Sequence, residues 1–277
     1  MISISDRLKR ISANIEKGET MADIGTDHGF LPLYLYETGR CPRVIMTDIS
    51  MYSLEKAREN TKRYYEHTST LFKENSDPSS GHGDHEDNII FRVGDGISVL
   101  DNGEVDVVVM AGIGGNLICD ILKDDPEKSR GFSKYVLQPR RHAGILRHFL
   151  LNNGFIITGE NLVREGKFIC EIITARPADK TEITIGGPER FIMSDEMMMT
   201  AGKSIIWEVP FWYADPKEPL AEEYIRRKLD REKMILRSKS DSIIADTEDT
   251  EYNIMYLEKL LVKQENAANR ETGNEIP

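Results

Sequence analysis

Apolar and polar positions follow two patterns along the chain, the spacing of amphipathic helices and the short continuous apolar runs of buried strands. Five apolar runs predict strands, at 20–24, 44–47, 88–93, 105–110 and 135–137. Helical spacing predicts helices near 5–18, 31–37, 52–66, 115–122 and 142–151. Because strands that alternate with helices form parallel sheets covered on both faces, we expect a doubly wound α/β domain.

The pattern changes after the helix at 142–151. Two strand-like runs, 155–163 and 167–175, are joined by only three residues. A connection this short cannot hold a crossover helix, so the two strands should pair antiparallel as a hairpin. A parallel sheet that ends in such a hairpin is typical of class I methyltransferases and unusual for dinucleotide dehydrogenases. We therefore expect a Rossmann-like class I methyltransferase sheet.

The last third of the chain has a different organisation. Five prolines interrupt the region between the sheet and residue 220. Helical spacing returns at 220–240 and 250–265 and predicts a helical hairpin. A coiled coil is one form that such a hairpin can take. We expect four parts: a methyltransferase domain at 1–176, a connecting region at 177–219, a helical hairpin at 220–266 and a disordered tail at 267–277.

A polar, turn-rich segment at 75–88 predicts a surface loop before the third strand. His82, Asp84 and His85 in this loop are residues of types that bind metals. Because no flanking structure fixes their geometry, a solvated loop is the preferred interpretation, and we expect no metal.

Composition and charge narrow the class of protein. The net charge of −11, from 36 Lys and Arg against 47 Asp and Glu, argues against coating of nucleic acid by bulk electrostatics. A local basic segment remains at 134–148, which has four cations and no acid. Three scattered cysteines do not form a disulfide framework, and no apolar run has the length of a membrane span. We expect a cytoplasmic monomer that does not enter a membrane.

The segment after the first strand, DIGTDHG at 23–29, carries the most chemical information. A glycine turn between strand and helix lets the backbone approach a ligand closely. A dinucleotide site would have a third glycine, whereas here Gly25 and Gly29 stand alone and Asp23 ends the strand. An acid there suits the cationic amino group of S-adenosylmethionine and would repel a pyrophosphate. The methyl donor is favoured over NAD, and a simple tight turn remains the alternative.

Two more acids follow the next two strands. Asp48 closes the second strand, where an acid can accept both hydroxyls of an adenosine ribose. Asp95, in a Gly-Asp-Gly turn after the third strand, is placed to accept the adenine amino group. Either alone is more often a turn or capping aspartate. Three acids at successive strand ends favour a ligand site, because ligands bind at the carboxyl edge of such sheets.

Two loops further along complete this edge. Residues 110–116, MAGIGGN, predict a backbone cradle near the transferred methyl group, with a flexible turn as the alternative. Residues 137–143, LQPRRHA, supply polar and cationic groups on the ligand edge, so we expect phosphate contacts from this loop.

These segments together resemble the bacterial TrmK family. The resemblance rests on ADIGTDHGFLPLYL (22–35), GDG (94–96), AGIGG (111–115), LQPRRHA (137–143) and the terminal helical hairpin, and it covers about residues 5–175. It implies an S-adenosylmethionine-dependent tRNA methyltransferase that modifies N1 of the adenine at tRNA position 22. The loop at 75–88 is longer than this family leads us to expect and looks like a peripheral insertion.

Roles can then be assigned to individual residues. Asp27 is the candidate catalytic residue, since a carboxylate at the adenine would stabilise the charge that develops there, and a helix N-cap is its alternative role. The expected cofactor-binding residues are Asp23, Gly25, Thr26, Gly29, Asp48, Ile49, Asp95, Gly96, Ala111 and Gly112. The expected substrate-binding residues are His28, Phe30, Gln138, Pro139, Arg140, Arg141, Arg147, Arg227 and Arg231.

Two other functions stay open at this point. One is a class I methyltransferase that acts on another RNA, a protein or a small molecule. The other is a non-catalytic nucleic-acid-binding or protein-binding module that kept the fold and lost the cofactor. The intact set of Asp23, Gly25, Asp48 and Asp95 argues against such a loss.

Overall fold

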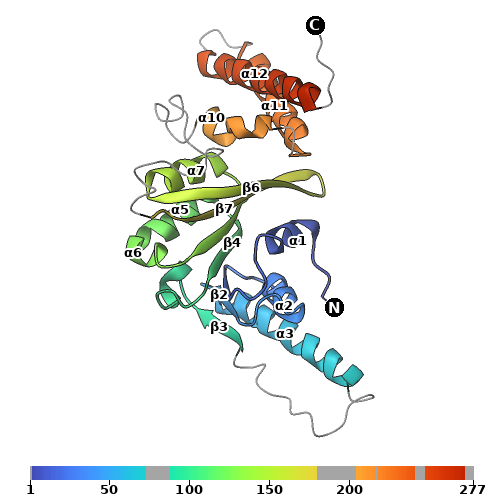
Figure 1. Cartoon of the computed structure of the whole chain (residues 1–277), viewed down its shortest axis with the longest axis vertical. Coiled ribbons are helices and arrows are strands. Elements are labelled where there is room, and N and C mark those ends of the chain that lie inside the picture. The colour runs from blue at the N-terminus through green and yellow to red at the C-terminus, as the bar shows by residue number, and fades with distance from the viewer. Residues whose placement is uncertain (1, 73–87, 180–203, 216–217, 241–246, 272–277) are drawn as a thin grey trace.

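The computed structural model describes residues 2–72, 88–179, 204–215, 218–240 and 247–271 (Figure 1). The polar loop with His82, Asp84 and His85 falls outside these ranges, as do residues 272–277 of the expected tail. Within them, no group of His, Cys, Asp and Glu side chains has the geometry of a metal site. No helix in these ranges is both long and apolar enough to cross a membrane.

A seven-stranded sheet forms the centre of the protein, in the order β3-β2-β1-β4-β5-β7-β6. The strands are β1 (Met21–Ile24), β2 (Val44–Asp48), β3 (Ile89–Val93), β4 (Val107–Ile113), β5 (Lys134–Pro139), β6 (Phe155–Glu165) and β7 (Phe168–Pro177). The first five pair in parallel, and β7 runs antiparallel to both β5 and β6. The predicted parallel sheet with its terminal hairpin is therefore confirmed.

Helices cover both faces of this sheet, as the continuous apolar runs predict. Val107 and Val109 of β4 face α1 (Asp6–Ser12), α2 (Phe30–Glu37) and α3 (Met51–Phe72). Val108 and Met110 face α5 (Gly115–Asp124) and α7 (Ala143–Asn152). Two short helices, η1 (Gly96–Val99) and α6 (Pro126–Ser129), complete the β3–β4 and α5–β5 connections. The consequence for the site is that the loops after β1 to β5 all open at one edge.

Some element limits differ from the prediction. Helix α1 ends at Ser12, although its apolar pattern continues to Ile15, because the chain turns there and still buries that side chain. Helix α3 extends to Phe72, beyond the predicted end at 66. Strand β4 continues to Ile113 through a bulge at Gly112, where φ is 78°. The strand thus carries part of the predicted glycine loop.

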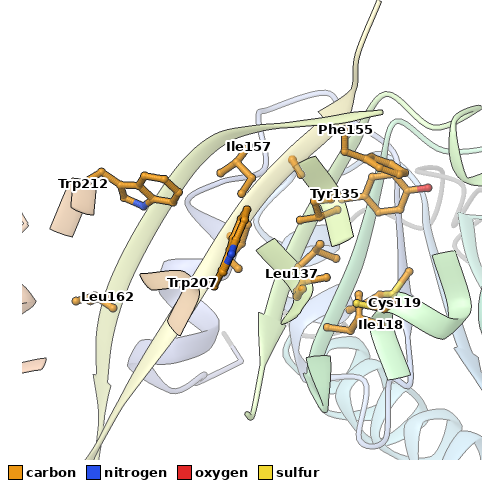
Figure 2. Close-up of a cluster of buried hydrophobic side chains, with 14 of the residues drawn as sticks. Ile118, Cys119, Tyr135, Leu137, Phe155, Ile157, Leu162, Trp207 and Trp212 are labelled. Carbon is orange, nitrogen blue, oxygen red and sulfur yellow. The ribbon is translucent and has the colours of Figure 1, made fainter. Parts of the chain in front are cut away.

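The C-terminal part adds α10 (Ile205–Glu208), η3 (Phe211–Ala214), α11 (Ala221–Ser240) and α12 (Glu248–Glu271). The short elements α10 and η3 escape prediction, since each has only four residues. Figure 2 shows Trp207 and Trp212 from these elements beside Ile157 and Leu162 of β6, in one cluster of buried side chains. Helices α11 and α12 pack on each other and share this core, and α12 includes the first residues of the predicted tail.

Candidate active site

A cavity of about 600 Å³ opens at the carboxyl edge of the sheet, among the ends of β1, β2, β3 and β4 and helix α1. Nine of the ten expected cofactor-binding residues line it: Asp23, Gly25, Thr26, Asp48, Ile49, Asp95, Gly96, Ala111 and Gly112. Asp27, His28, Phe30 and Arg140 line it as well. The parallel strand order brings these separate loops together, because their carboxyl ends meet at one edge.

The loop from β1 to α2 is shaped by two glycines with different tasks. Gly25 has a φ of 76°, and its N–H and that of Thr26 both donate to the carbonyl of Thr47, at 2.9 and 3.0 Å. Gly29 also has a positive φ, but it does not line the cavity. A Cβ there would lie 2.9 Å from Sδ of Met46. Gly29 is thus the one expected cofactor-binding residue outside the cavity lining, and its lack of a side chain lets α2 start close to β2.

Asp23 is the next-to-last residue of β1 and places a buried carboxyl group in the cavity lining. Burial raises its pKa to about 7, while the hydrogen bond of 2.8 Å from Thr26 Oγ1 and the charge of Arg7 act in the opposite direction. The value of about 7 already includes a smaller upward contribution from the carboxylate of Asp48. A buried acid with a pKa near neutrality is ready to ionise when a cationic ligand binds beside it.

The other two acids lie at the ends of β2 and β3. Asp48 accepts a 2.8 Å hydrogen bond from the N–H of Ser50 through Oδ1, so it forms a local turn and also faces the cavity. Asp95 stands at the N-cap of η1, but its side chain makes no capping hydrogen bond. The next residue, Gly96, has a φ of 55°, and a Cβ there would lie 2.8 Å from Ile121. The turn therefore needs glycine and leaves the Asp95 carboxylate for a ligand.

The glycines after β4 divide in a similar way. Ala111 and Gly112 line the cavity, and a Cβ on Gly112 would meet no atom within 4 Å. Its positive φ, rather than crowding, favours glycine there. Gly115 begins α5, where a Cβ would lie 2.3 Å from the carbonyl oxygen of His142. One part of this segment thus forms a wall of the cavity, and the other lets α5 pack against the chain before α7.

Arg7 of α1 is a site residue that the sequence analysis missed. It lines the cavity, and its Nη1 donates a 2.9 Å hydrogen bond to Oε1 of Gln138, while its Nε lies 3.7 Å from Glu165. Gln138 and Pro139 are buried at the end of β5 and do not line the cavity, and Gln138 holds Arg7 through this hydrogen bond. The only sequence signal was a basic residue on the first helix, and its place at the sheet edge depends on distant contacts.

Asp27 lies at the mouth of the cavity and is half exposed. Its Oδ2 is 3.4 Å from Nε2 of His28, and its Oδ1 is 3.9 Å from Nζ of Lys56. Helix α2 has Gly29 as its N-cap and no side-chain capping bond, so the alternative role of Asp27 as an N-cap is wrong. The rings of His28 and Phe30, two expected substrate-binding residues, stack on each other with their centroids 5.5 Å apart. The expected catalytic and substrate-binding groups therefore share one mouth.

Arg147 is a correction to the expected substrate-binding set. Its side chain is fully buried, 2.8 Å from Glu160 and 2.6 Å from Glu171, and it donates a 2.8 Å hydrogen bond to the hydroxyl of Tyr213. Burial alone would lower its pKa, but Glu160 and the other acidic groups raise it well above the ordinary value. Trp212 donates to the same Glu160, so this cluster joins α7 and β6 to η3. The cation is structural, since no phosphate can reach it.

Three other expected substrate-binding arginines lie outside the cavity lining. Arg141 is exposed next to Arg140 and does not line the cavity. Arg227 and Arg231 lie on α11, where Arg227 pairs with Glu223 at 2.7 Å. These two residues are part of the C-terminal helices at the far end of the protein from α2 and α3 (Figure 1).

The lining fits S-adenosylmethionine on chemical grounds. Asp23 offers a buried carboxyl group to the ammonium group, Asp48 offers acceptors for the ribose hydroxyls, and Asp95 has no capping partner. The wall at Gly112 is open, since a Cβ there would meet no atom within 4 Å. A cavity of about 600 Å³ is within the usual range for a ligand of this size.

Comparison with known proteins agrees with this geometry. The sequence profile of the family described as a methyltransferase domain matches residues 4–173. The tRNA (adenine(22)-N(1))-methyltransferase of Bacillus subtilis (strain 168) is 29% identical over 179 residues, which are 65% of this chain and 67% of that protein. Protein MG248 of Mycoplasma genitalium is 30% identical over 200 residues, 68% of this chain and 80% of its own.

Solved structures show the same fold over nearly the whole chain. The B. subtilis m1A22 tRNA methyltransferase TrmK has a TM-score of 0.66 and 23% identity, and the alignment covers 96% of this chain and 99% of that one. M. capricolum TrmK, solved with S-adenosyl-homocysteine, has a TM-score of 0.62 and 20% identity, with 95% and 96% covered. The fold match therefore includes the C-terminal helices. From its profile match, its relatives and its site, the chain belongs to the methyltransferase-domain family and, within it, to the TrmK family.

Proposed function

We propose that this protein transfers the methyl group of S-adenosylmethionine to N1 of an adenine in tRNA, the adenine at position 22. The observation that carries the proposal is the cavity that joins Asp23, Asp48 and Asp95 to the mouth formed by Asp27 and the His28–Phe30 stack. The choice of tRNA as substrate and of adenine 22 as target follows the B. subtilis relative, a tRNA (adenine(22)-N(1))-methyltransferase. A tRNA-modifying enzyme of this kind acts in the cytoplasm, and we propose a monomer.

Methyl transfer needs geometry more than acid–base chemistry. The bound cofactor supplies an electrophilic methyl group, which the N1 lone pair attacks in line with the departing sulfur. The acids at the strand ends hold the donor, and the wall at Ala111 and Gly112 limits where the acceptor ring can lie. N1 is on the Watson–Crick edge, so the adenine must leave its pair or stack before it enters the cavity. The exposed Phe30 ring and its His28 partner offer a surface for stacking at the mouth.

Asp27 has a defined part in this mechanism. N1 loses its lone pair to the new bond, and the adenine ring becomes cationic. A carboxylate at the mouth stabilises that charge most in the transition state and product, and it stabilises the neutral ring little. Its partners, His28 and Lys56, hold it loosely at 3.4 and 3.9 Å, which leaves its oxygens accessible.

Contacts to the tRNA backbone extend beyond the cavity. Arg140 lines the cavity and Arg141 follows it, so the loop after β5 presents two adjacent cations at this edge. Arg227 and Arg231 on α11 are further proposed phosphate contacts. In this division of the chain, residues 1–176 bind cofactor and target nucleotide, and residues 220–266 contribute tRNA affinity.

The test is direct. Purified protein is incubated with unfractionated tRNA and isotopically labelled S-adenosylmethionine, and the digested nucleosides are separated by mass spectrometry. We expect label in 1-methyladenosine. Label in another nucleoside, or in a small molecule in preference to tRNA, would favour the alternative of a class I methyltransferase with a different substrate. Absence of cofactor binding in calorimetry would favour a non-catalytic module.

A further inference from the structure

Helix α3 presents Tyr52, Lys56 and Asn60 at four-residue intervals beside the loop after β1, so the three side chains lie on one face. Nδ2 of Asn60 donates a 2.9 Å hydrogen bond to the carbonyl of His28. Nζ of Lys56 is 3.9 Å from Oδ1 of Asp27, and it lies 4.7 Å from the centre of the Tyr52 ring. This row therefore follows the loop that carries the candidate catalytic residue.

Exposed apolar side chains gather around the same mouth. Ten large apolar side chains are exposed in the described part of the chain. Three of them, Phe30, Ile49 and Leu117, line the cavity, and three more, Met51, Tyr52 and Val93, lie within three residues of a lining residue in the sequence. Tyr52 is 72% exposed, the highest value in that set. A bound cofactor can cover Ile49 and Leu117, which line the cavity, but Tyr52 lies outside the lining. An aromatic ring in this position is available to a substrate rather than to the cofactor.

The chemistry of the pair matches a nucleotide. Tyr52 offers a flat aromatic ring, and bases stack on such rings without a requirement for sequence. Lys56 offers an ammonium group at one side of that ring, and its contact with Asp27 is long enough to leave donors for another acceptor. When the target adenine leaves its stack, the neighbouring base loses a stacking partner. A ring at the mouth can replace that partner, and the adjacent cation can contact the connecting phosphate.

We propose that Tyr52 and Lys56 form a binding site for the nucleotide next to the target adenine, with the Tyr52 ring stacked on its base and Lys56 on the phosphate between the two. This inference rests on the proposed tRNA methyltransferase activity. It gives the enzyme a second recognition point on α3, next to the loop that carries Asp27. It also gives Lys56 two partners, Asp27 and the phosphate.

The test compares methylation kinetics of three variants, Tyr52→Ala, Tyr52→Phe and Lys56→Ala, with unfractionated tRNA and saturating S-adenosylmethionine. Tyr52→Ala should raise the KM for tRNA about 10-fold, because a stacking partner is lost. Tyr52→Phe keeps the ring and should retain most of the affinity. Lys56→Ala should raise the KM for tRNA. It should also reduce the slope of log affinity against log salt by the amount expected for the loss of about one phosphate contact. The affinity for S-adenosylmethionine, measured by calorimetry, should stay within twofold in all three.

A matched control is Lys123→Ala, because Lys123 is an exposed cation in the last turn of α5 and does not line the cavity. It should leave the KM for tRNA unchanged. Unchanged KM in both Tyr52→Ala and Lys56→Ala would overturn the inference. A fall in kcat at constant KM for Lys56→Ala would also overturn it, since Lys56 would then act only on Asp27. If the wild-type protein methylates no tRNA, the proposed function itself fails, and that result is separate from the variant comparison.

Discussion

Nη1 of Arg7 donates a 2.9 Å hydrogen bond to Oε1 of Gln138, which joins the first helix to the end of β5 across 131 residues of sequence. The same arginine lines the cavity and lowers the pKa of Asp23. Helix α1 is therefore part of the active site and not only a cover for the sheet. The position of one N-terminal side chain thus affects both the buried acid of the cavity, Asp23, and the end of β5 that leads to Arg140.

Replacement of Asp48 tests the proposed ribose contact. Asp48→Ala removes a carboxylate from the cavity and should weaken S-adenosylmethionine binding more than about tenfold, since a hydrogen bond to a charged group contributes about 1.5–3 kcal/mol. Titration calorimetry with the cofactor measures this. Asp101→Ala, an exposed acid outside the cavity lining, serves as the control. If Asp48→Ala keeps wild-type affinity, Asp48 forms only the local turn with Ser50.

Asp23 should make the stability of the free protein depend on pH. Its folded pKa is raised by burial to about 7 from an ordinary value of 3.8. A carboxyl group with a raised pKa contributes stability in its neutral form, fully present below about pH 4, and this contribution is lost as the pH rises through about 7. Asp23→Asn, which stays neutral, should remove that loss. Urea unfolding of both proteins between pH 5 and pH 8 measures the difference.

Bound cofactor should favour the ionised form of Asp23 instead of the neutral form, because the ammonium group of the cofactor stabilises the carboxylate. Wild-type affinity for S-adenosylmethionine should therefore increase from pH 6 to pH 8, with release of a proton below pH 7 that calorimetry in buffers of different ionisation enthalpy detects. For the unfolding experiment, a difference in the free energy of unfolding between wild type and Asp23→Asn that stays constant from pH 5 to pH 8 would show that Asp23 is ionised in the free protein.

Variants of Arg147 and Arg140 compare a buried structural cation with a cation that we propose binds the substrate. Arg147→Met leaves Glu160 and Glu171 without their buried partner and should lower the free energy of unfolding by about 3–5 kcal/mol. Arg140→Ala changes the charge equally at an exposed position, so it should weaken tRNA binding and reduce its salt dependence with little loss of stability. Chemical denaturation and filter binding of both variants measure the contrast. Equal stability of the two variants would mean that the buried cluster does not hold η3 to the sheet.

Asp27→Asn tests the proposed catalytic carboxylate. Asp27 has a φ of 47°, and asparagine adopts this conformation as readily, so the loop should keep its shape. The rate at saturating tRNA and cofactor should fall at least ~100-fold with both affinities within a few-fold, because the lost interaction exists mainly in the transition state. Single-turnover methylation measures this. A near-wild-type rate would assign catalysis to positioning alone, and a loss of tRNA affinity at an unchanged rate would make Asp27 a substrate-binding residue.

The acids of the site could be predicted from sequence because each follows a short apolar run. Asp23, Asp48 and Asp95 end or follow β1, β2 and β3, and the parallel order of these strands alone brings them to one cavity. Local pattern and a rule about sheet edges were sufficient for this part. The terminal hairpin followed in the same way from the three-residue connection between two apolar runs.

The remaining features depend on contacts between distant segments. Arg147 looks like a member of a basic surface segment, and only the packing of η3 and α10 on α7 shows that it is buried. A hydrogen bond to Gln138 holds Arg7 at the cavity, and the residue spacing in the first helix does not indicate this contact. Gly29 has the position of a ligand-binding glycine, but its neighbours Met46 and Ala57 explain its lack of a side chain. Burial and long-range packing were the information that the local sequence lacked.

Methylation of two matched transcripts tests the central claim most directly. One tRNA transcript carries adenine at position 22, and the other differs only by guanine at that position with the same fold. With labelled S-adenosylmethionine, the first should accept about one methyl group per molecule, recovered as 1-methyladenosine at position 22, and the second should accept none. Equal labelling of both transcripts, or label on another atom or nucleotide of the first, would contradict the assignment of this protein as a tRNA adenine-22 N1-methyltransferase.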